Sequence, residues 1–220
     1  MLMYSWMVWV EHAPERYDVS VRLLTGGRID KVKDEIASGI LPGDKVLDIG
    51  CGTGSLAIKC VARGAQVTGL DISESMLAEC RKNLKRSGTE GQVAILKDSV
   101  TNLRAHFEPE SLDVVVSTMV VGELSKPYLD YIFRECRTVL KPGGRIMIAD
   151  EVWPEGPVTR ILFRIVMAIM WMPQFAILRR AFFPIRELRS IIAGAGFEIV
   201  SKRTYPFSTI QLIEGRKLDA

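Results

Sequence analysis

The chain has 220 residues, enough for one domain to bury a sizeable core without disulfides or structural metals. A net charge of +3 with no basic stripe along the sequence excludes a nucleic-acid-binding surface from our expectations. The four cysteines follow no metal-binding or disulfide spacing, which favours a reducing, cytoplasmic location and no bound metal.

The first 40 residues are expected to form a helical cap. Residues 1–10 are strongly apolar, but they lack the basic flank and cleavage site of a secretory signal and are too short to cross a bilayer. A further helix is predicted over 32–40 and ends at Gly39. The apolar segment is expected to pack over a binding cleft, against a partner or against the core.

The clearest motif lies between Lys45 and Asp71 and reads strand, glycine turn, helix, strand, acid. Its parts are an apolar strand over 46–49, alternate glycines at Gly50, Gly52 and Gly54, a helix over 55–63, and a strand over 67–70. Glycines let the backbone turn tightly and approach a ligand closely. An acid at the end of the second strand can accept hydrogen bonds from a ribose diol, so the motif predicts a nucleoside site.

Asp48 helps to separate two classes of nucleotide cofactor. Dinucleotide sites use the spacing G-x-G-x-x-G, whereas this chain has G-x-G-x-G shortly after an acid. A carboxylate there repels a pyrophosphate but suits a ligand that carries an ammonium group and a sulfonium. The run Asp-Ile-Gly-Cys-Gly-Thr-Gly resembles motif I of the class I S-adenosylmethionine-dependent methyltransferases, with Asp71 in the place of their ribose-binding acid.

The resemblance implies a set of cofactor contacts along the chain. Cys51 would contribute its backbone, Ile72 would stack on the base, and Met76 would flank the same pocket or pack in the core. Asp98 and Ser99, which follow a strand predicted over 93–96, would bind the adenine ring. The candidate cofactor-binding residues are Tyr17, Asp48, Gly50, Cys51, Gly52, Gly54, Asp71, Ile72, Met76, Asp98, Ser99 and Ser117.

The following segment is predicted to alternate loops, strands and one helix. These are a polar loop over 103–111 with a solvated His106, a buried strand over 112–117, a loop over 117–123 beside the transferred methyl, a helix over 128–140 and a strand over 146–149. The Leu-Lys-Pro-Gly-Gly turn before the last strand is a second match to the family. Glu123, Tyr128 and Asp150 are candidates for substrate contact, and no catalytic residue is assigned.

An apolar insert is predicted over 154–186. Its most apolar part, 161–178, is interrupted by Arg164, Pro173 and Gln174, which argues against a membrane-spanning helix. Residues 158–183 are therefore interpreted as a substrate lid, and as alternatives a dimer or protein-partner surface or a peripheral membrane contact.

The C-terminal part is predicted to contain a helix over 184–196 and an antiparallel pair of strands over 197–204 and 207–214. The resemblance implies a single domain over 1–220 of the α/β class. Its fold would be the three-layer, Rossmann-like methyltransferase fold, with a seven-stranded mixed sheet that ends in this antiparallel hairpin.

The implied reaction is in-line transfer of the S-adenosylmethionine methyl group, which leaves S-adenosylhomocysteine. The apolar insert favours a hydrophobic or bulky small-molecule acceptor, as in quinone- and sterol-methylating members of the class. Two alternatives stay open. The runs Ala-Pro-Glu-Arg-Tyr-Asp and Leu-Leu-Thr-Gly-Gly-Arg-Ile-Asp-Lys resemble methyltransferases associated with corrinoid proteins, and the fold could also serve as a non-catalytic nucleoside-binding scaffold.

Overall fold

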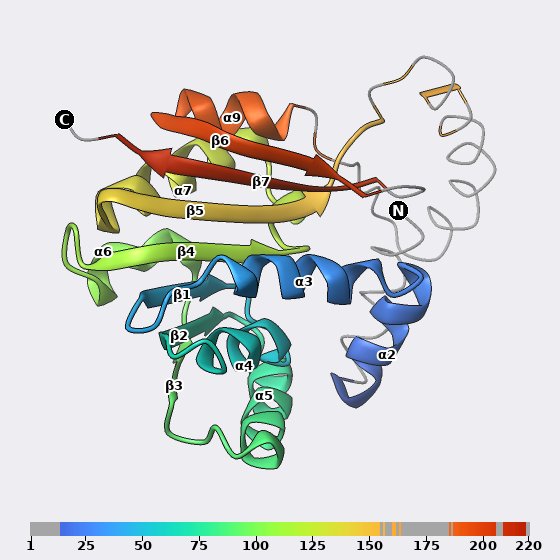
Figure 1. Ribbon diagram of the computed structural model, residues 1–220, viewed down its shortest axis with the longest axis vertical. Helices are drawn as coiled ribbons and strands as arrows, with labels where there is room; N and C mark the ends of the chain where they lie inside the picture. The colour runs from blue at the N-terminus through green and yellow to red at the C-terminus, as the bar shows by residue number, and fades with distance from the viewer. Residues whose placement is uncertain are drawn as a thin grey trace.

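The computed structural model describes residues 14–154, 156, 160, 161, 163, 185, 187–205 and 209–218. Its centre is a sheet of seven strands, with helices on both faces (Figure 1). The strands are β1 (Lys45–Ile49), β2 (Gln66–Asp71), β3 (Val93–Lys97), β4 (Leu112–Thr118), β5 (Leu140–Glu151), β6 (Phe197–Thr204) and β7 (Ile210–Lys217). The helices are α2 (Pro14–Leu24), α3 (Arg28–Ser38), α4 (Ser55–Val61), α5 (Glu74–Ser87), α6 (Leu103–His106), α7 (Lys126–Val139) and α9 (Leu188–Gly194), with short 3-10 turns η1 (Val100–Asn102) and η2 (Val121–Glu123).

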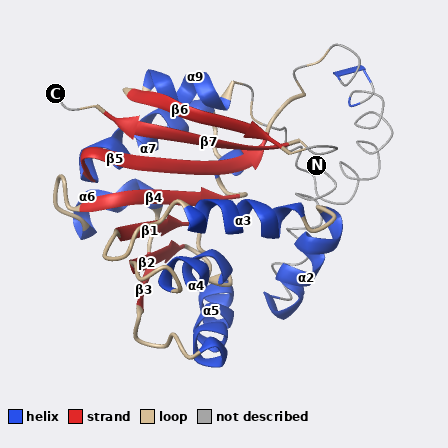
Figure 2. Ribbon diagram, in the orientation of Figure 1, coloured by secondary structure: helices blue, strands red, loops and turns tan. Residues whose placement is uncertain are grey.

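The strand order is β3-β2-β1-β4-β5-β7-β6, and β1 pairs in parallel with both β2 and β4. The order therefore reverses at β1, which is where open α/β sheets bind ligands at the carboxyl ends of their strands. β7 runs antiparallel to both β5 and β6, as Figure 2 shows. The predicted mixed sheet and its antiparallel end are confirmed.

Two apolar cores, one on each face, hold the helices to the sheet. On one face, Val46 and its neighbours pack against α3, α4 and α5, while on the other Leu47 packs towards α7 and α9. Neighbouring residues of a strand point to opposite faces, so a strand with apolar residues at both positions is buried on both sides. The carboxyl ends of the strands are thus fixed by packing on both faces.

Several boundaries differ from the sequence prediction; α3 begins at Arg28 instead of 32, and β7 spans Ile210–Lys217 instead of 207–214. The predicted polar loop over 103–111 begins with helix α6, because Leu103 is fully buried and anchors a turn too short to show helical periodicity. The Leu-Lys-Pro-Gly-Gly turn lies inside β5, where a register shift opposite β4 accommodates it. Helix α9 begins at Leu188, four residues later than the predicted start.

The segments expected as an N-terminal apolar helix and as an apolar insert lie mostly outside the described residues. Within the insert, the ring of Phe163 packs edge-on against Trp153, with 5.3 Å between ring centroids. Ile185 forms a parallel bridge with Val152 just beyond β5. No helix in the described part of the chain combines the length and the apolar character that a membrane crossing needs.

Candidate functional site

The glycine turn after β1 has an unusual backbone. Gly50, Gly52 and Gly54 all adopt left-handed conformations, with φ of 66°, 53° and 79°. A Cβ on Gly50 would collide with Val120, and a Cβ on Gly54 would lie 2.5 Å from the Cys80 sulfur. The positions that side chains would occupy are therefore filled by the protein itself, so these glycines are needed to shape the turn.

Asp71 at the end of β2 connects the turn to the neighbouring strand. Its Oδ2 accepts a hydrogen bond from the Gly52 N–H at 2.9 Å, and its Oδ1 accepts one from the Ser73 N–H at the same distance. The N–H groups of Gly50 and Cys51 also donate to the carbonyl of Leu70, at 2.7 and 3.1 Å. A carboxylate has about four acceptor positions, so Asp71 can bind hydroxyl groups while it holds the turn.

The two apolar residues beyond Asp71 differ sharply in exposure. Ile72 is 71% exposed, and it is the side chain next to the ribose-binding candidate. Met76 is buried, and its methyl group would be 3.1 Å from a Cβ on Gly52. Ile72 is therefore free to cover a flat ring, whereas Met76 supports the turn from below.

Asp98 and Ser99 follow β3 at the same edge of the sheet. One oxygen of Asp98 accepts hydrogen bonds from the Ser99 N–H at 2.7 Å and from the Asn102 amide at 2.8 Å. Its other oxygen lies 2.6 Å from His106 Nε2. The Ser99 side chain accepts a hydrogen bond from the Thr101 N–H and thereby caps η1. His106 is exposed, as expected, and α6 places its ring beside Asp98, a contact that the sequence did not predict.

The pairing with His106 sets the ionisation of Asp98. His106 holds the pKa of the Asp98 carboxyl below its usual 3.8, with smaller contributions from Asn102 and the Ser99 N–H. We therefore expect a carbon-13 titration of Asp98 to give a pKa below 3.8 in the native chain and a higher value in His106→Ala. The same pKa in both proteins would contradict the pairing.

Ser117 joins the two central strands at the edge where the turn begins. Its side chain is fully buried, and its hydroxyl donates to the carbonyl of Ile49 at 2.8 Å. Any contact of Ser117 with a ligand above the sheet therefore involves its backbone. The adjacent Met119 is a buried non-glycine residue with φ of 62°, a conformation that costs energy and is held by a hydrogen bond from its N–H to Ala149.

Removing the Ser117 hydroxyl should destabilise the fold without reaching the ligand. Ser117→Ala is expected to lower the free energy of unfolding by about 1 kcal/mol, because the Ile49 carbonyl loses its buried side-chain donor. Urea denaturation measures this change, and Ser111→Ala, which removes an exposed hydroxyl, is the matched control. Equal unfolding midpoints for the two variants would contradict the structural role of Ser117.

The three candidates for substrate contact, Glu123, Tyr128 and Asp150, lie in different environments. Asp150 is fully buried, and its Oδ2 accepts the N–H of Gly122, so it holds the loop after β4. Tyr128 is 57% exposed near the start of α7. Glu123 ends η2, and its side chain is outside the described residues. Of the described side chains, Tyr128 lies on α7 and Asp150 on β5, and these two form no recognisable catalytic arrangement.

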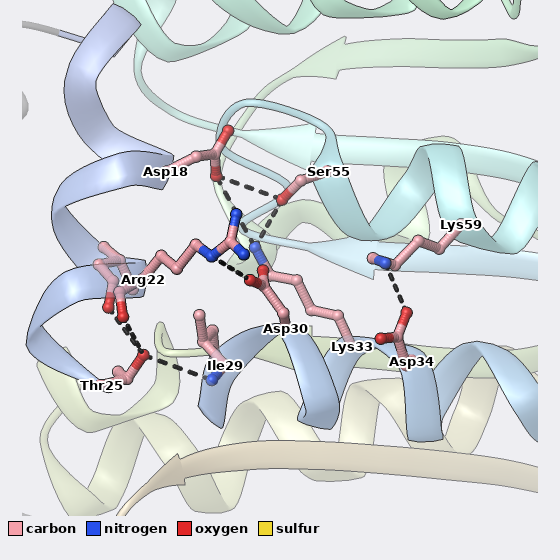
Figure 3. A network of polar contacts seen from close by, with 10 residues as sticks. Asp18, Arg22, Thr25, Ile29, Asp30, Lys33, Asp34, Ser55 and Lys59 are labelled. Carbon is pink, nitrogen blue, oxygen red and sulfur yellow. Dashed lines mark hydrogen bonds and ion pairs between the residues drawn. The ribbon is translucent and has the colours of Figure 1, made fainter. Parts of the chain in front are cut away.

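A polar network below the turn was missed by the sequence analysis. Asp18 on α2 accepts hydrogen bonds from Thr53 Oγ1 at 2.8 Å and from Ser55 Oγ at 3.4 Å. Lys33 on α3 donates to the same Ser55 Oγ at 2.5 Å, as Figure 3 shows. The adjacent Tyr17, one of the predicted cofactor contacts, packs partly buried against the core.

Lys33 could have been recognised from the pattern of α3. The buried residues of this helix are Ile29, Val32, Lys33, Ile36 and Ala37, which recur at the spacing of one helix face. A lysine in the middle of an apolar stripe is expensive to bury without partners. A lysine on the apolar face of α3 therefore predicts a buried hydrogen-bond or charge partner for its ammonium group.

Asp48, the acid of the glycine motif, is 1% exposed. Burial raises its pKa to about 7, and the Asp71 charge adds to this, while Lys33 and the Ala57 N–H act in the opposite direction. Its Oδ2 is buried without a hydrogen-bond partner among the described residues. An orphaned carboxylate oxygen of this kind is suited to an additional donor or cation.

Comparison with known proteins shows which family this chain resembles. Residues 46–144 match the family described as a methyltransferase domain. The ubiquinone/menaquinone biosynthesis C-methyltransferase UbiE of Cupriavidus metallidurans is 37% identical over 146 residues, 63% of this chain and 57% of that protein. A ubiquinone biosynthesis O-methyltransferase of Stutzerimonas stutzeri is 34% identical over 122 residues, 56% of this chain and 49% of that protein. The chain thus spans about half the length of these curated relatives.

The fold also resembles that of solved methyltransferases. A solved S-adenosylmethionine-dependent methyltransferase of Methanosarcina mazei has a TM-score of 0.68 and 20% identity, over 84% of this chain and 97% of that one. The sheet is that of the doubly wound, Rossmann-like α/β proteins. More narrowly, residues 46–144 match a methyltransferase domain, and the relatives named above are methyltransferases, which agrees with the resemblance seen in the sequence.

Proposed function

We propose that this chain transfers a methyl group from S-adenosylmethionine to a hydrophobic or bulky small molecule. The observation that carries the proposal is the row of groups at the carboxyl ends of β1, β2 and β3. Asp48 lies beneath the glycine turn, Asp71 braces it, and Asp98 follows the next strand. This row ends at β1, where the strand order reverses, and that point is the ligand site of such sheets.

Each group in the row has a role that suits one part of the cofactor. Asp48 would attract the ammonium of the amino-acid moiety, and Asp71 would accept hydrogen bonds from the ribose hydroxyls. Ile72 would cover the adenine ring, and Asp98 with Ser99 would bind the polar edge of that ring. When bound, S-adenosylmethionine supplies an activated methyl group, so the protein contributes mainly orientation and exclusion of water.

The acceptor is inferred from the relatives and from composition. The two curated relatives are named for C- and O-methylation in ubiquinone biosynthesis, so both carbon and oxygen nucleophiles suit the proposal. We propose that the N-terminal cap over 1–40 and the insert over 154–186 complete the acceptor side of the site. The comparisons give no support to a corrinoid-protein acceptor or a non-catalytic scaffold.

Methyl transfer can be tested with S-adenosylmethionine labelled in its methyl group. The full chain is incubated with demethylated quinol analogues, simple phenols and sterols, and the organic phase is counted. The proposal expects label in at least one apolar acceptor, inhibited by S-adenosylhomocysteine. Tight binding of S-adenosylhomocysteine with no labelled product from any acceptor would favour the scaffold alternative instead.

A further inference from the structure

Asp18 connects helix α2 to the glycine turn through the side chains of Thr53 and Ser55. Its Oδ2 accepts a hydrogen bond from Thr53 Oγ1 at 2.8 Å, and its Oδ1 accepts one from Ser55 Oγ at 3.4 Å. Thr53 lies between Gly52 and Gly54 in the turn, and Ser55 is the first residue of α4. One carboxylate from α2 therefore contacts both the turn and the helix that follows it.

The Thr53 hydroxyl is suited to fix the turn because it is buried. Thr53 is 2% exposed, whereas the Asp18 side chain that accepts its hydrogen bond is 42% exposed. The Thr53 carbonyl is also held, by the side-chain amide of Asn83 on α5 at 3.1 Å. A buried hydroxyl that loses its acceptor is destabilising. The conformation of Thr53 therefore depends on the position of Asp18.

Lys33 completes this cluster from α3. Its Nζ donates to Ser55 Oγ at 2.5 Å and lies 3.9 Å from Asp18 Oδ1. Figure 3 shows Asp18 from α2, Lys33 from α3 and Ser55 from α4 converging on one point. Only 11% of the Lys33 side chain is exposed, and an ammonium in such a position needs negative charge close by to remain stable. Lys33 therefore helps to hold the Asp18 carboxylate beside the turn.

Helix α2 has few apolar attachments within the described chain. Val21 is its one buried residue there, and Tyr17 packs partly buried against the core. A surface helix is held mainly by burial of an apolar face, so its polar contacts matter more where that face is small. The ion pair between Arg22 and Asp30 has side chains that are 70% and 43% exposed, and such pairs contribute little. Asp18 is therefore the main polar attachment of α2.

We propose that Asp18 is a positioning residue that couples the docking of α2 to the shape of the glycine turn, and thereby to the affinity for the nucleoside. The inference rests on the proposed function, because the turn is the proposed cofactor site. Asp71 braces the turn at Gly52 from β2, and Asp18 braces it at Thr53 from α2. Since coupling between two sites is reciprocal, a ligand that requires the ordered turn also stabilises the docked α2.

The first test is a double-mutant cycle on the affinity for S-adenosylhomocysteine, measured by calorimetry. Asp18→Ala and Thr53→Val each remove one side of the hydrogen bond, and Thr53→Val keeps the branched shape of the side chain. Each variant should bind about tenfold more weakly, the value of one hydrogen bond to a charged group. The double variant should be no weaker than the single ones. Independent losses that multiply to about a hundredfold, or native affinity in both single variants, would overturn the inference.

Conservative and neighbouring replacements separate positioning from general damage. Asp18→Asn keeps an oxygen that accepts the Thr53 hydroxyl, and Thr53→Ser keeps that hydroxyl, so both variants should retain most of the native affinity. Asp34→Ala breaks an ion pair with Lys59 that also joins α3 to α4, one helical turn beyond Ser55, and should leave the affinity unchanged. An equal loss of affinity in Asp34→Ala and Asp18→Ala would overturn the inference.

The second test is amide hydrogen exchange over residues 14–24, which form α2. S-adenosylhomocysteine should slow this exchange in the native chain, and Thr53→Val should speed it in the free protein although Thr53 is not part of α2. The same α2 exchange in free Thr53→Val and in the free native chain would overturn the inference, even if binding is normal.

The free protein also separates this inference from the proposed function. If the native chain binds no S-adenosylhomocysteine, the proposed function fails, and exchange in the free protein still decides whether Asp18 couples α2 to the turn. If Thr53→Val does not fold, exchange over residues 50–54 in free Asp18→Ala gives the same information. Faster exchange there supports the coupling, and unchanged exchange would contradict it.

Discussion

Replacing Gly50 with alanine should abolish cofactor binding and lower the free energy of unfolding by about 3 kcal/mol. About 1–2 kcal/mol comes from placing a side chain in the left-handed conformation, and about 1–3 kcal/mol from forcing that side chain into an occupied position. The Gly50 φ of 66° and the collision with Val120 supply both terms. Urea denaturation and calorimetry with S-adenosylhomocysteine measure the two effects.

Gly43→Ala is the matched control for this substitution. Gly43 has φ of 86°, but a Cβ placed on it meets nothing within 4 Å. It lies in the turn before β1, so its replacement should cost about 1–2 kcal/mol of stability from the backbone alone and leave affinity unchanged. If Gly50→Ala had the stability and the affinity of the native chain, the turn would not need a glycine at this position.

Replacing Asp71 with alanine should weaken S-adenosylhomocysteine binding by about 1–3 kcal/mol, the usual value of a hydrogen bond to a charged group. Two effects would combine, because the ribose of the proposed ligand would lose its acceptor, and the Gly52 and Ser73 N–H groups lose theirs. The loss is therefore expected to appear in affinity and also in the stability of the free protein. Calorimetry and urea denaturation of the same samples separate the two.

Asp113→Ala provides the control for the structural part. Asp113 also accepts a backbone N–H, that of Lys45 at 2.9 Å, and pairs with Lys141, but it lies at the other end of β1. This variant should lose stability and keep its affinity for the ligand. If Asp71→Ala retained native affinity, the assignment of Asp71 to the ribose would be wrong.

The glycine motif and the sheet could be predicted because their signals are local. Each parallel strand is a short apolar run, and the glycines, Asp48 and Asp71 stand at fixed distances within one strand–turn–helix–strand unit. The N-cap of α5 is equally local, because the Ser73 side chain accepts the N–H of Met76, three residues further on. Patterns of this kind depend on residues only a few positions apart.

The contacts that were missed join residues distant in the sequence or in short elements. The pairing of Asp98 with His106 depends on α6, which spans only Leu103–His106 and shows no periodicity. The bonds from Thr53 and Ser55 to Asp18 cross 35 and 37 positions and depend on how α2 packs. Ser117 resembled a loop hydroxyl in the sequence, whereas the register of β4 against β1 turns it into a buried link.

The most direct measurement is a crystal structure of the full chain soaked with S-adenosylhomocysteine. We predict density for the nucleoside over the turn formed by Gly50, Gly52 and Gly54, with its ribose hydroxyls on Asp71 and its adenine beside Ile72. An empty turn at saturating concentration, or a nucleoside bound at the amino ends of the strands, would contradict the methyltransferase site and leave only the fold.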